Sequence, residues 1–383
     1  MIKRRDCVKH IKTALRRSRA VALLGPRQSG KTTLAQELVN IHSPNYFDLE
    51  DSSSLIALSD PKTVLEPLKD IVVIDEVQQR PDLFPILRVL LDRKPLPAKF
   101  LILGSASPGL LRQSSESLAG RLEVVEIGGF GLEEVGLKKV SQLWVRGGFP
   151  LSFLAKNDTD SFAWRKNFIK IFLERDLREQ GIDIPTVTLH RFWAMLANSH
   201  ARVWNAAPIA SSLGITEPTV RKYLDIFTGV FMARQLQPWY ANIKKRQVKS
   251  PKVYIRDTGI LNFLLGLKTE AEVLRHPYCG ASWEGFVIEA AIRSVEPDDV
   301  YFWATHQGAE IDLVFSKGGR VYGVEIKRAD APTMTPSMRI ALEDLKLERI
   351  AVIYPGKKRY SLHKKIDVIP VDEILGGMKS LFQ

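Results

Sequence analysis

The composition is that of an ordinary folded protein with a basic surface. The chain has 383 residues, and its 45% apolar and 26% charged residues exclude a long disordered polar tract. Its length allows more than one domain. Lysine and arginine number 55 against 43 acidic residues, and this net charge of +12 suggests a polyanionic partner such as nucleic acid or an anionic membrane face.

The cysteines and the start of the chain point to the reducing cytoplasm. Cys7 and Cys279 are too few and too far apart for a disulfide framework or a thiolate metal site. The basic first segment is followed by an apolar run over residues 20–24 only, too short for a signal-peptide core or a membrane span. We therefore expect a cytoplasmic protein with no membrane partner.

Short apolar runs alternate with helical patterns in the first part of the chain. The runs cover residues 20–24, 46–49, 71–74, 100–103 and 124–127. Between the third and fourth runs, apolar residues recur at helical spacing from Leu83 to Leu91. This alternation predicts an α/β fold with a doubly wound parallel sheet, which we assign to residues 1–150.

The turn after the first predicted strand has the pattern of a phosphate-binding loop. It reads Gly25, Pro26, Arg27, Gln28, Ser29, Gly30, Lys31 and Thr32, followed by Thr33. The glycines allow backbone N–H groups and a helix N-terminus to face phosphates, Lys31 adds positive charge, and Thr32 offers a hydroxyl to Mg²⁺. We expect these residues to bind ATP with Mg²⁺, the alternative being a chance glycine-rich turn.

Two acids follow the third predicted strand, at the edge of the sheet where the ligand of such a loop is expected. Asp75 is placed to hold the magnesium, and Glu76 to orient or polarise the attacking water. The alternative for Glu76 is a solvated acid at a helix start. After the fourth strand, Ser105 is a candidate to sense the γ-phosphate or simply to cap a helix.

Arg121 is the candidate for an arginine finger or sensor that neutralises transition-state charge, from the same or a neighbouring subunit. A plain surface arginine is an equal alternative. A neighbouring subunit would make the chain a homo-oligomer.

The middle of the chain changes to a helical period after Gly147, Gly148 and Pro150. We predict a helical lid or linker at 151–204 and a winged-helix-like domain at 205–270, where residues 208–223 read as a helix, a glycine turn and a second helix. Its candidate DNA contacts are Thr219, Arg221, Lys222, Lys244, Lys245, Arg246 and Lys249. The alternative is that this helical pair only docks the flanking domains.

The last part, residues 271–383, reads as a separate small α/β unit with acids on successive elements. Glu284 lies on a predicted helix, Asp312 on a strand, and Glu325 and Lys327 on one face of the next strand. Carboxylates from neighbouring strands can share a hard cation, Mg²⁺ or Mn²⁺, while the lysine stabilises a phosphorane or orients water. Gln307 and Glu310 are candidate assistants, although Glu310 also suits a solvated position. The alternatives are a solvated hairpin or a nuclease-like fold without catalytic power.

Several segments together carry a family resemblance. They are residues 25–32, 75–76, 104–105, 117–121, 147–150, 174–176, 249–258 and 310–327. Together they resemble the prokaryotic AAA-type ATPases that are fused to a C-terminal domain of formerly unknown function. The resemblance implies an ATPase core, a winged-helix-like segment and a domain similar to the PD-(D/E)xK nuclease fold. This chain departs from better-known AAA proteins at Ser105, which stands where asparagine is usual.

The sequence thus predicts an ATPase whose nucleotide state gates a DNA-directed, metal-dependent nuclease-like domain. Glu284, Asp312 and Glu325 are its candidate metal ligands, and Glu325 and Lys327 its catalytic pair. The alternative is a nucleotide-switched regulator or adaptor that binds DNA or a protein and whose C-terminal domain is not catalytic.

Overall fold

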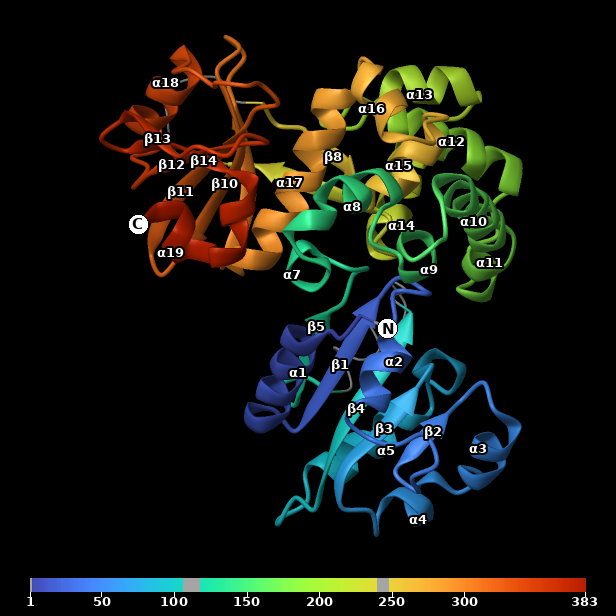
Figure 1. Cartoon of the computed structure of the whole chain (residues 1–383). Coiled ribbons are helices and arrows are strands. Elements are labelled where there is room, and N and C mark those ends of the chain that lie inside the picture. Colours follow the sequence, from blue (N-terminus) through green and yellow to red (C-terminus); the bar gives the residue numbers. More distant parts are fainter. Residues whose placement is uncertain (1, 106–117, 240–247) are drawn as a thin grey trace. The chain divides into compact units, whose positions relative to one another are not determined.

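The computed structural model describes residues 2–105, 118–239 and 248–383, and the chain forms two compact units (Figure 1). The first comprises residues 1–130, 179–181 and 229–231, and the second comprises the rest. The main segment of the first unit ends at Phe130, before the boundary predicted at residue 150. The segments predicted as separate domains at 151–204, 205–270 and 271–383 lie almost entirely in one unit. No helix in the described ranges is long and apolar enough to cross a membrane.

The first unit is built on a parallel sheet of five strands in the order β2-β3-β4-β1-β5. The strands are β1 (Ala20–Gly25), β2 (Tyr46–Asp48), β3 (Asp70–Asp75), β4 (Ala98–Ser105) and β5 (Leu122–Glu126). Every neighbouring pair is parallel, which confirms the predicted sheet. β1 lies between β4 and β5, so the loop that follows it leaves from the interior of the sheet.

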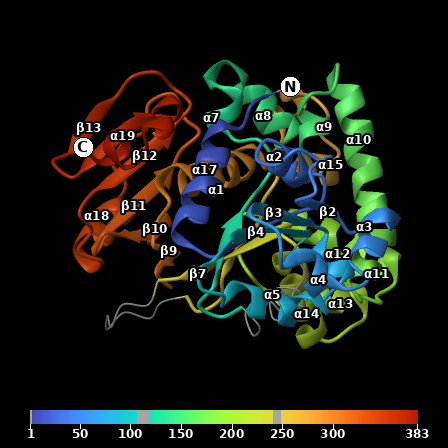
Figure 2. The same cartoon turned by 90° about the horizontal axis from the view of Figure 1, so that it is seen from below.

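Helices cover both faces of this sheet (Figures 1 and 2). Alternate side chains of the strands are buried against them. The helices are α1 (Arg5–Arg17), α2 (Lys31–Gln36), α3 (Ser52–Ala57), α4 (Pro61–Leu65) and α5 (Leu83–Leu91), with a short 3₁₀ turn, η1, at Val77–Gln79. Val21 and Leu23 of β1 pack in one core with α1 and α2, whereas Ala22 and Leu24 pack in the other with α5. The faces differ because side chains alternate along a strand.

The second unit begins with helices. They are α7 (Leu132–Val135), α8 (Val140–Arg146), α9 (Pro150–Phe153), α10 (Asp158–Ile171), α11 (Leu177–Glu179), α12 (Thr186–Asn198), α13 (Ala206–Leu213), α14 (Glu217–Gly229), α15 (Thr258–Leu264), α16 (Glu270–Arg275) and α17 (Cys279–Val295). A 3₁₀ turn, η2 (Leu137–Lys139), precedes α8, and a π-helical turn, η3 (Phe172–Asp176), separates α10 from α11. The helical period predicted from residue 161 is thus present.

A mixed sheet of nine strands runs through the same unit. The strands are β6 (Arg202–Val203), β7 (Ala233–Pro238), β8 (Lys252–Ile255), β9 (Asp299–Ala304), β10 (Glu310–Lys317), β11 (Arg320–Ile326), β12 (Ile350–Tyr354), β13 (Tyr360–His363) and β14 (Ile366–Pro370). Their order is β13-β14-β12-β11-β10-β9-β7-β8-β6. The remaining elements are α18 (Pro336–Asp344), the 3₁₀ turn η4 (Val371–Gly376) and α19 (Gly377–Phe382). β7 joins the two parts of the sheet because it pairs with β8 and, in parallel, with β9.

The glycine-rich break at residues 147–150 connects α8 to α9 inside this unit. Gly147 has a φ of 76°, and a Cβ there would lie 2.1 Å from Oδ1 of Asp257, so the position requires glycine. Asp257 also accepts a hydrogen bond from the backbone N–H of Gly148 at 2.7 Å and caps α15. One aspartate therefore joins the α8–α9 turn to the start of α15.

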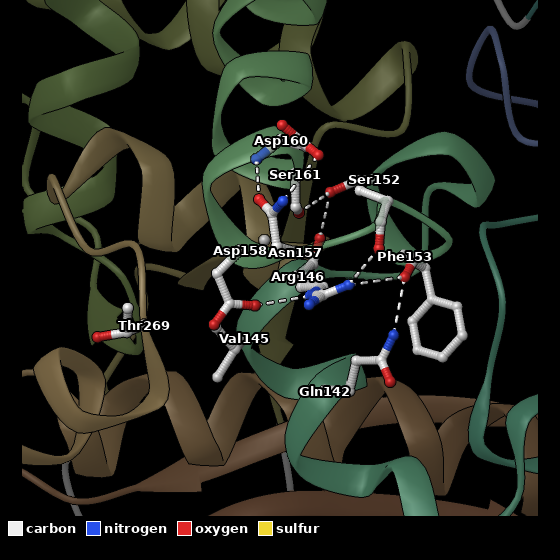
Figure 3. Close-up of polar contacts among 12 residues, drawn as sticks. Gln142, Val145, Arg146, Ser152, Phe153, Asn157, Asp158, Asp160, Ser161 and Thr269 are labelled. Carbon is white, nitrogen blue, oxygen red and sulfur yellow. Dashed lines mark hydrogen bonds and ion pairs between the residues drawn. The ribbon is translucent and has the colours of Figure 1, made fainter.

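Arg146, at the end of α8, organises the turn into α10, as Figure 3 shows. Its guanidinium donates to Oδ1 of Asp158 and to the backbone carbonyl of Ala155, both at 2.7 Å. Its own carbonyl accepts a hydrogen bond from the hydroxyl of Ser152, which also contacts the hydroxyl of Ser161. These side chains of α8, α9 and α10 all have hydrogen-bond partners, and their contacts hold the start of α10 against α8 and α9.

Candidate functional site

The loop between β1 and α2 has the conformation that its glycines allow. Gly25 ends β1, and a Cβ at this position would lie 1.9 Å from the carbonyl oxygen of Ile127. Gly30 caps α2 with a φ of 92°, and Gln28 adopts a φ of 62°. Positive φ at two positions turns the chain tightly between strand and helix.

The ammonium group of Lys31 is folded onto this loop. Its Nζ donates to the backbone carbonyls of Gly25 at 3.0 Å and Pro26 at 2.9 Å. Burial lowers the pKa of Lys31 to about 8, and the charges of Glu76 and Asp75 only partly oppose this effect. The ammonium group is thus buried and hydrogen-bonded to neutral carbonyl oxygens, and an anion that binds beside it would stabilise its charge.

Thr32 and Asp75, which the sequence predicted to share a magnesium ion, are in contact. The Thr32 hydroxyl donates to Oδ2 of Asp75 at 2.8 Å, and the hydroxyl of Tyr46 donates to the same oxygen at 3.0 Å. Burial raises the pKa of Asp75, although both hydrogen bonds work in the opposite direction. A hydroxyl and a carboxylate are hard oxygen donors, so this pair fits Mg²⁺. No pattern in the sequence singles out Tyr46.

Other predicted residues of the loop lie around this pair. Glu76 follows β3 in a left-handed conformation, with a φ of 54°, and its side chain contacts Gln78. Arg27 forms ion pairs with Glu179 at 2.7 Å and, at the longer distance of 3.8 Å, with Glu50. Glu76 is thus placed beside Asp75 at the edge of the sheet.

Ser29 and Thr33 complete the predicted loop. The hydroxyl of Ser29 is buried without a hydrogen-bond partner in the described part of the chain, and Thr33 is half-buried on α2.

Arg4 braces the loop from outside the motif. Its guanidinium donates to the carbonyl of Ser29 at 3.0 Å and to the carbonyls of Gly128 and Gly129 at 3.2 and 3.1 Å. It therefore ties the loop to the segment that follows β5. No pattern in the sequence marks Arg4, because its partners are 25 residues away or more along the chain.

The structure places Arg121 away from the loop of its own subunit. This arginine precedes β5 and forms a bidentate ion pair with Asp92, with both distances at 2.7 Å. Leu122 pairs with Ala20 at the start of β1, whereas Gly25 is at its end, roughly 16 Å further at the usual rise of a strand. Arg121 is thus at the edge of the sheet opposite to the loop and does not act there within its own subunit.

Ser105 is described only in its backbone, which pairs with Gly25 in the β4–β1 ladder. Residue 117 and Lys244, Lys245 and Arg246 lie outside the described residues.

A cluster of acids occupies the second unit, on the elements where the sequence predicted them. Glu284 lies on α17, Asp312 on β10, and Glu325 on β11. β10 and β11 are antiparallel with Leu313 opposite Val324, so Asp312 and Glu325 come next along the ladder. Oδ2 of Asp312 accepts a hydrogen bond from the backbone N–H of Ile326 at 2.9 Å. The three predicted acids are thus brought together.

A lysine that the sequence did not single out lies among these acids. Nζ of Lys252, on β8, is 3.0 Å from Oε1 of Glu284 and 3.4 Å from Oδ1 of Asp312, and it also pairs with Glu310. The Tyr254 hydroxyl donates to the same Glu284 oxygen at 2.7 Å. Burial would lower the pKa of Lys252, but Tyr254 and the three carboxylates raise it well above its ordinary value.

Glu325 and Lys327 form a second pair, with Nζ 2.6 Å from Oε1. Burial, together with the charge of Asp312, raises the pKa of Glu325 to about 8 and that of Glu284 to about 7. The other Glu325 oxygen is buried without a hydrogen-bond partner among the described residues.

The arrangement in the acidic cluster does not fit a divalent metal. Within the described ranges no three histidine, cysteine, aspartate or glutamate side chains are placed to hold one. An ammonium group contacts two of the three predicted ligands, Glu284 and Asp312. In this structure two of the predicted metal ligands, Glu284 and Asp312, are ion-paired with Lys252, and metal binding there stays a prediction.

Family models match three successive segments of the chain. Residues 17–136 match the AAA domain family. Residues 137–271 and 279–374 match two domains of unknown function, DUF8612 and DUF4143. The Walker-type ATPase PABY2304 of Pyrococcus abyssi superposes over 69% of this chain and 96% of its own, with a TM-score of 0.50 and 15% identity, which shows a shared fold.

Two relatives match over nearly the whole chain. They are the uncharacterized proteins Rv2008c of Mycobacterium tuberculosis and Mb2031c of Mycobacterium bovis, each 48% identical over 376 residues, which are 98% of this chain and 85% of the relative. The chain therefore belongs to the family of these two mycobacterial proteins, and it carries an AAA domain with the fold of P-loop ATPases.

Proposed function

We propose that this protein binds ATP with Mg²⁺ at residues 25–33 and hydrolyses it. The observation that carries the proposal is the contact between the Thr32 hydroxyl and the Asp75 carboxylate, 2.8 Å apart, at the carboxyl edge of a parallel sheet. The buried Lys31 at the same edge supplies the positive charge that phosphates need.

The residues of the site divide the work of phosphoryl transfer. Lys31 would leave the carbonyls of its loop and neutralise phosphate charge, and Thr32 and Asp75 would hold the magnesium, which neutralises charge on the phosphates. Glu76 would orient the attacking water. An arginine finger from a neighbouring subunit would require a homo-oligomer, and this is the role that remains for Arg121.

ATP turnover by two variants tests this proposal. Lys31→Ala should abolish turnover and weaken ATP binding, whereas Glu76→Gln should keep binding and lose turnover, because only the water loses its partner. Lys62→Ala, an exposed lysine of α4, is the matched control and should behave as wild type. Undiminished turnover by the Lys31 variant would refute the assignment.

We further propose that the second unit is directed to DNA. Its support is the succession of α12, β6, α13, α14, β7 and β8, with antiparallel pairing of β8 to both β6 and β7. This order of helices and strands is that of a winged-helix domain. Arg221 and Lys222 on α14 are exposed, as phosphate contacts require, and Thr219 is half-buried beside them.

DNA affinity at several salt concentrations tests the role of α14. The double variant Arg221→Ala with Lys222→Ala should bind duplex DNA more weakly and with a shallower salt dependence. Fewer phosphate contacts mean that fewer counterions are released from the DNA on binding. Lys166→Ala with Lys170→Ala, both exposed on α10, is the control of equal charge. Equal affinity of the two double variants would refute the contact.

The C-terminal part has two candidate roles. The succession of α17, β9, β10, β11, α18 and β12 supports a PD-(D/E)xK nuclease-like domain, and with it metal-dependent DNA cleavage by Glu325 and Lys327. The contact of Lys252 with Glu284 and Asp312 favours the second role, a nucleotide-switched regulator without catalytic power.

Cleavage of plasmid and branched DNA decides between the two roles. Wild type and Asp312→Asn are compared with Mg²⁺ and with Mn²⁺. Cutting that requires Asp312 establishes the nuclease, and no cutting of any substrate by wild type establishes the regulator.

A further inference from the structure

Lys252 lies on a strand whose backbone is paired on both edges, and its side chain is buried. It lies on β8, where its backbone is opposite Leu236 of β7 on one side and Val203 of β6 on the other. The side chain is only 3% exposed, and its Nζ also lies 6.0 Å from the centre of the Phe302 ring. A strand paired on both edges holds its backbone in register, and the contacts with Glu284, Glu310 and Asp312 hold the buried ammonium group among the acids.

The oxygens around this ammonium group are already engaged. Asp312 accepts from Lys252 with Oδ1 and from the Ile326 N–H with Oδ2, and Oε1 of Glu284 accepts from both Lys252 and Tyr254. A divalent ion would need these same oxygens at distances of about 2.0 to 2.6 Å. It would also bring a second cation close to a buried ammonium group, which is electrostatically unfavourable.

The cation and the carboxylates come from different segments of the chain. Glu284, Glu310 and Asp312 belong to the segment that matches DUF4143, whereas Lys252 belongs to the segment that matches DUF8612. The cation that contacts these acids therefore comes from outside the segment that matches DUF4143.

We infer that the ammonium group of Lys252 is the resident cation of this cluster and excludes divalent metal from Glu284 and Asp312 while β8 is paired. The inference rests on the nuclease-like arrangement proposed above, in which these acids are the metal-ligand positions. It makes the C-terminal domain a latent metal site that Lys252 closes. Removal of this one charge should open the site to Mn²⁺.

Mn²⁺ binding to the full chain, measured by electron paramagnetic resonance without nucleotide, tests this inference. Wild type should show no Mn²⁺ binding that depends on Asp312, whereas Lys252→Met should gain one such site and bind at least about tenfold more tightly than wild type. Lys252→Arg keeps the charge and should resemble wild type. Lys252→Met with Asp312→Asn should lose the gained site.

Two outcomes would overturn the inference. One is Mn²⁺ binding by wild type that Asp312→Asn abolishes. The other is a folded Lys252→Met variant that gains no Mn²⁺ site. If the variant folds only when metal is present, Mn²⁺ should raise its melting temperature and leave that of wild type unchanged. If it does not fold at all, the comparison of wild type with Asp312→Asn decides alone.

These measurements use neither ATP turnover nor DNA, so failure here is distinguishable from failure of the proposed ATPase or DNA-binding roles. Cleavage that depends on Mn²⁺ and Asp312 in wild type would contradict the inference while supporting the nuclease.

Discussion

Two buried lysines, one in each unit, show how neighbours decide what a buried charge does. Lys31 and Lys252 are 5% and 3% exposed, so both have lost most of their hydration. Lys31 donates to two backbone carbonyls, and burial lowers its pKa to about 8. Lys252 is surrounded by three carboxylates that raise its pKa despite equal burial.

The difference lies in the balance of charge, since desolvation opposes the charged form in both places. In the loop of the first unit, the positive charge lacks a carboxylate within ion-pair distance among the contacts described and is stabilised by an arriving phosphate. In the cluster of the second unit, the positive charge already has carboxylate partners, so it serves as an internal counter-ion. A buried lysine is therefore evidence for an anion site only when no carboxylate forms an ion pair with it.

The largest expected effect is on stability, and it should separate the two lysines. Lys252→Met leaves three carboxylates without their cation and should lower the free energy of unfolding of the second unit by about 3 to 5 kcal/mol. Lys31→Met removes a charge that burial penalises and should change stability by less than about 1 kcal/mol. All 7 tryptophans lie in the second unit, so their fluorescence follows urea unfolding of that unit and is the measurement for Lys252→Met.

Circular dichroism follows unfolding of the Lys31 variant. Equal stability of Lys252→Met and wild type would contradict the role of Lys252 as a counter-ion, because the three acids would then be stable without it.

The next effect concerns the acid beside Lys31. Asp75→Asn removes the charge that Thr32 and Tyr46 contact and should lower magnesium-dependent ATP turnover by about 100-fold, because a neutral amide holds the metal poorly. Asp70→Asn is the matched control, since Asp70 starts the same strand and is exposed. Turnover should be measured over a range of Mg²⁺ concentrations. Equal loss in both variants would show that only the strand was damaged.

A smaller effect concerns a buried histidine in the second unit. Nδ1 of His200 accepts from the backbone N–H of Ile255 at 3.0 Å, and burial lowers its pKa to about 3. The unfolded chain takes up the proton near pH 6.5, whereas the folded chain does so only near pH 3. Stability from this group is therefore complete above pH 6.5 and falls by about 1.4 kcal/mol per pH unit as the pH decreases below that value.

The measurement is urea unfolding of wild type and His200→Gln at pH 7 and 5.5. Because other acids also titrate, only the difference between the two proteins counts, and it should shrink as the pH falls. A difference that does not change with pH would contradict the buried neutral imidazole.

The smallest effect is expected at Arg121. Its ion pair with Asp92 is at the sheet edge opposite to the loop, so Arg121→Ala should change ATP turnover by less than about twofold at enzyme concentrations where the protein is monomeric. Turnover that falls only at concentrations where subunits associate would instead identify an arginine acting between subunits.

The first unit was readable from the sequence because its signals are local. The run at 20–24 and the glycines after it place strand, loop and helix within one segment, and β1 and α2 lie there. Asp75 follows directly from the end of β3. The distance of Arg121 from the loop was not predictable, because it depends on which end of β5 the arginine occupies. A sequence pattern does not show how far an arginine lies from a loop nearly one hundred residues earlier.

The sequence predicted only part of the acidic cluster. Period two along β11 placed Glu325 and Lys327 on one face, and both lie in the cluster. Lys252 was missed because its partners Glu284 and Asp312 are 32 and 60 residues further along the chain. The sequence shows acids that would suit a metal, but it does not show which cation the fold delivers to them.

The parallel pairing of β7 with β9, through Gln237 and Pro238, has a mechanical consequence. Proline donates no backbone hydrogen bond, so Pro238 offers only its carbonyl to this short ladder, which joins the two parts of the sheet. β8, which carries Lys252, lies on one side of this ladder and β10, which carries Asp312, lies on the other, so separation there would part the cation from that acid.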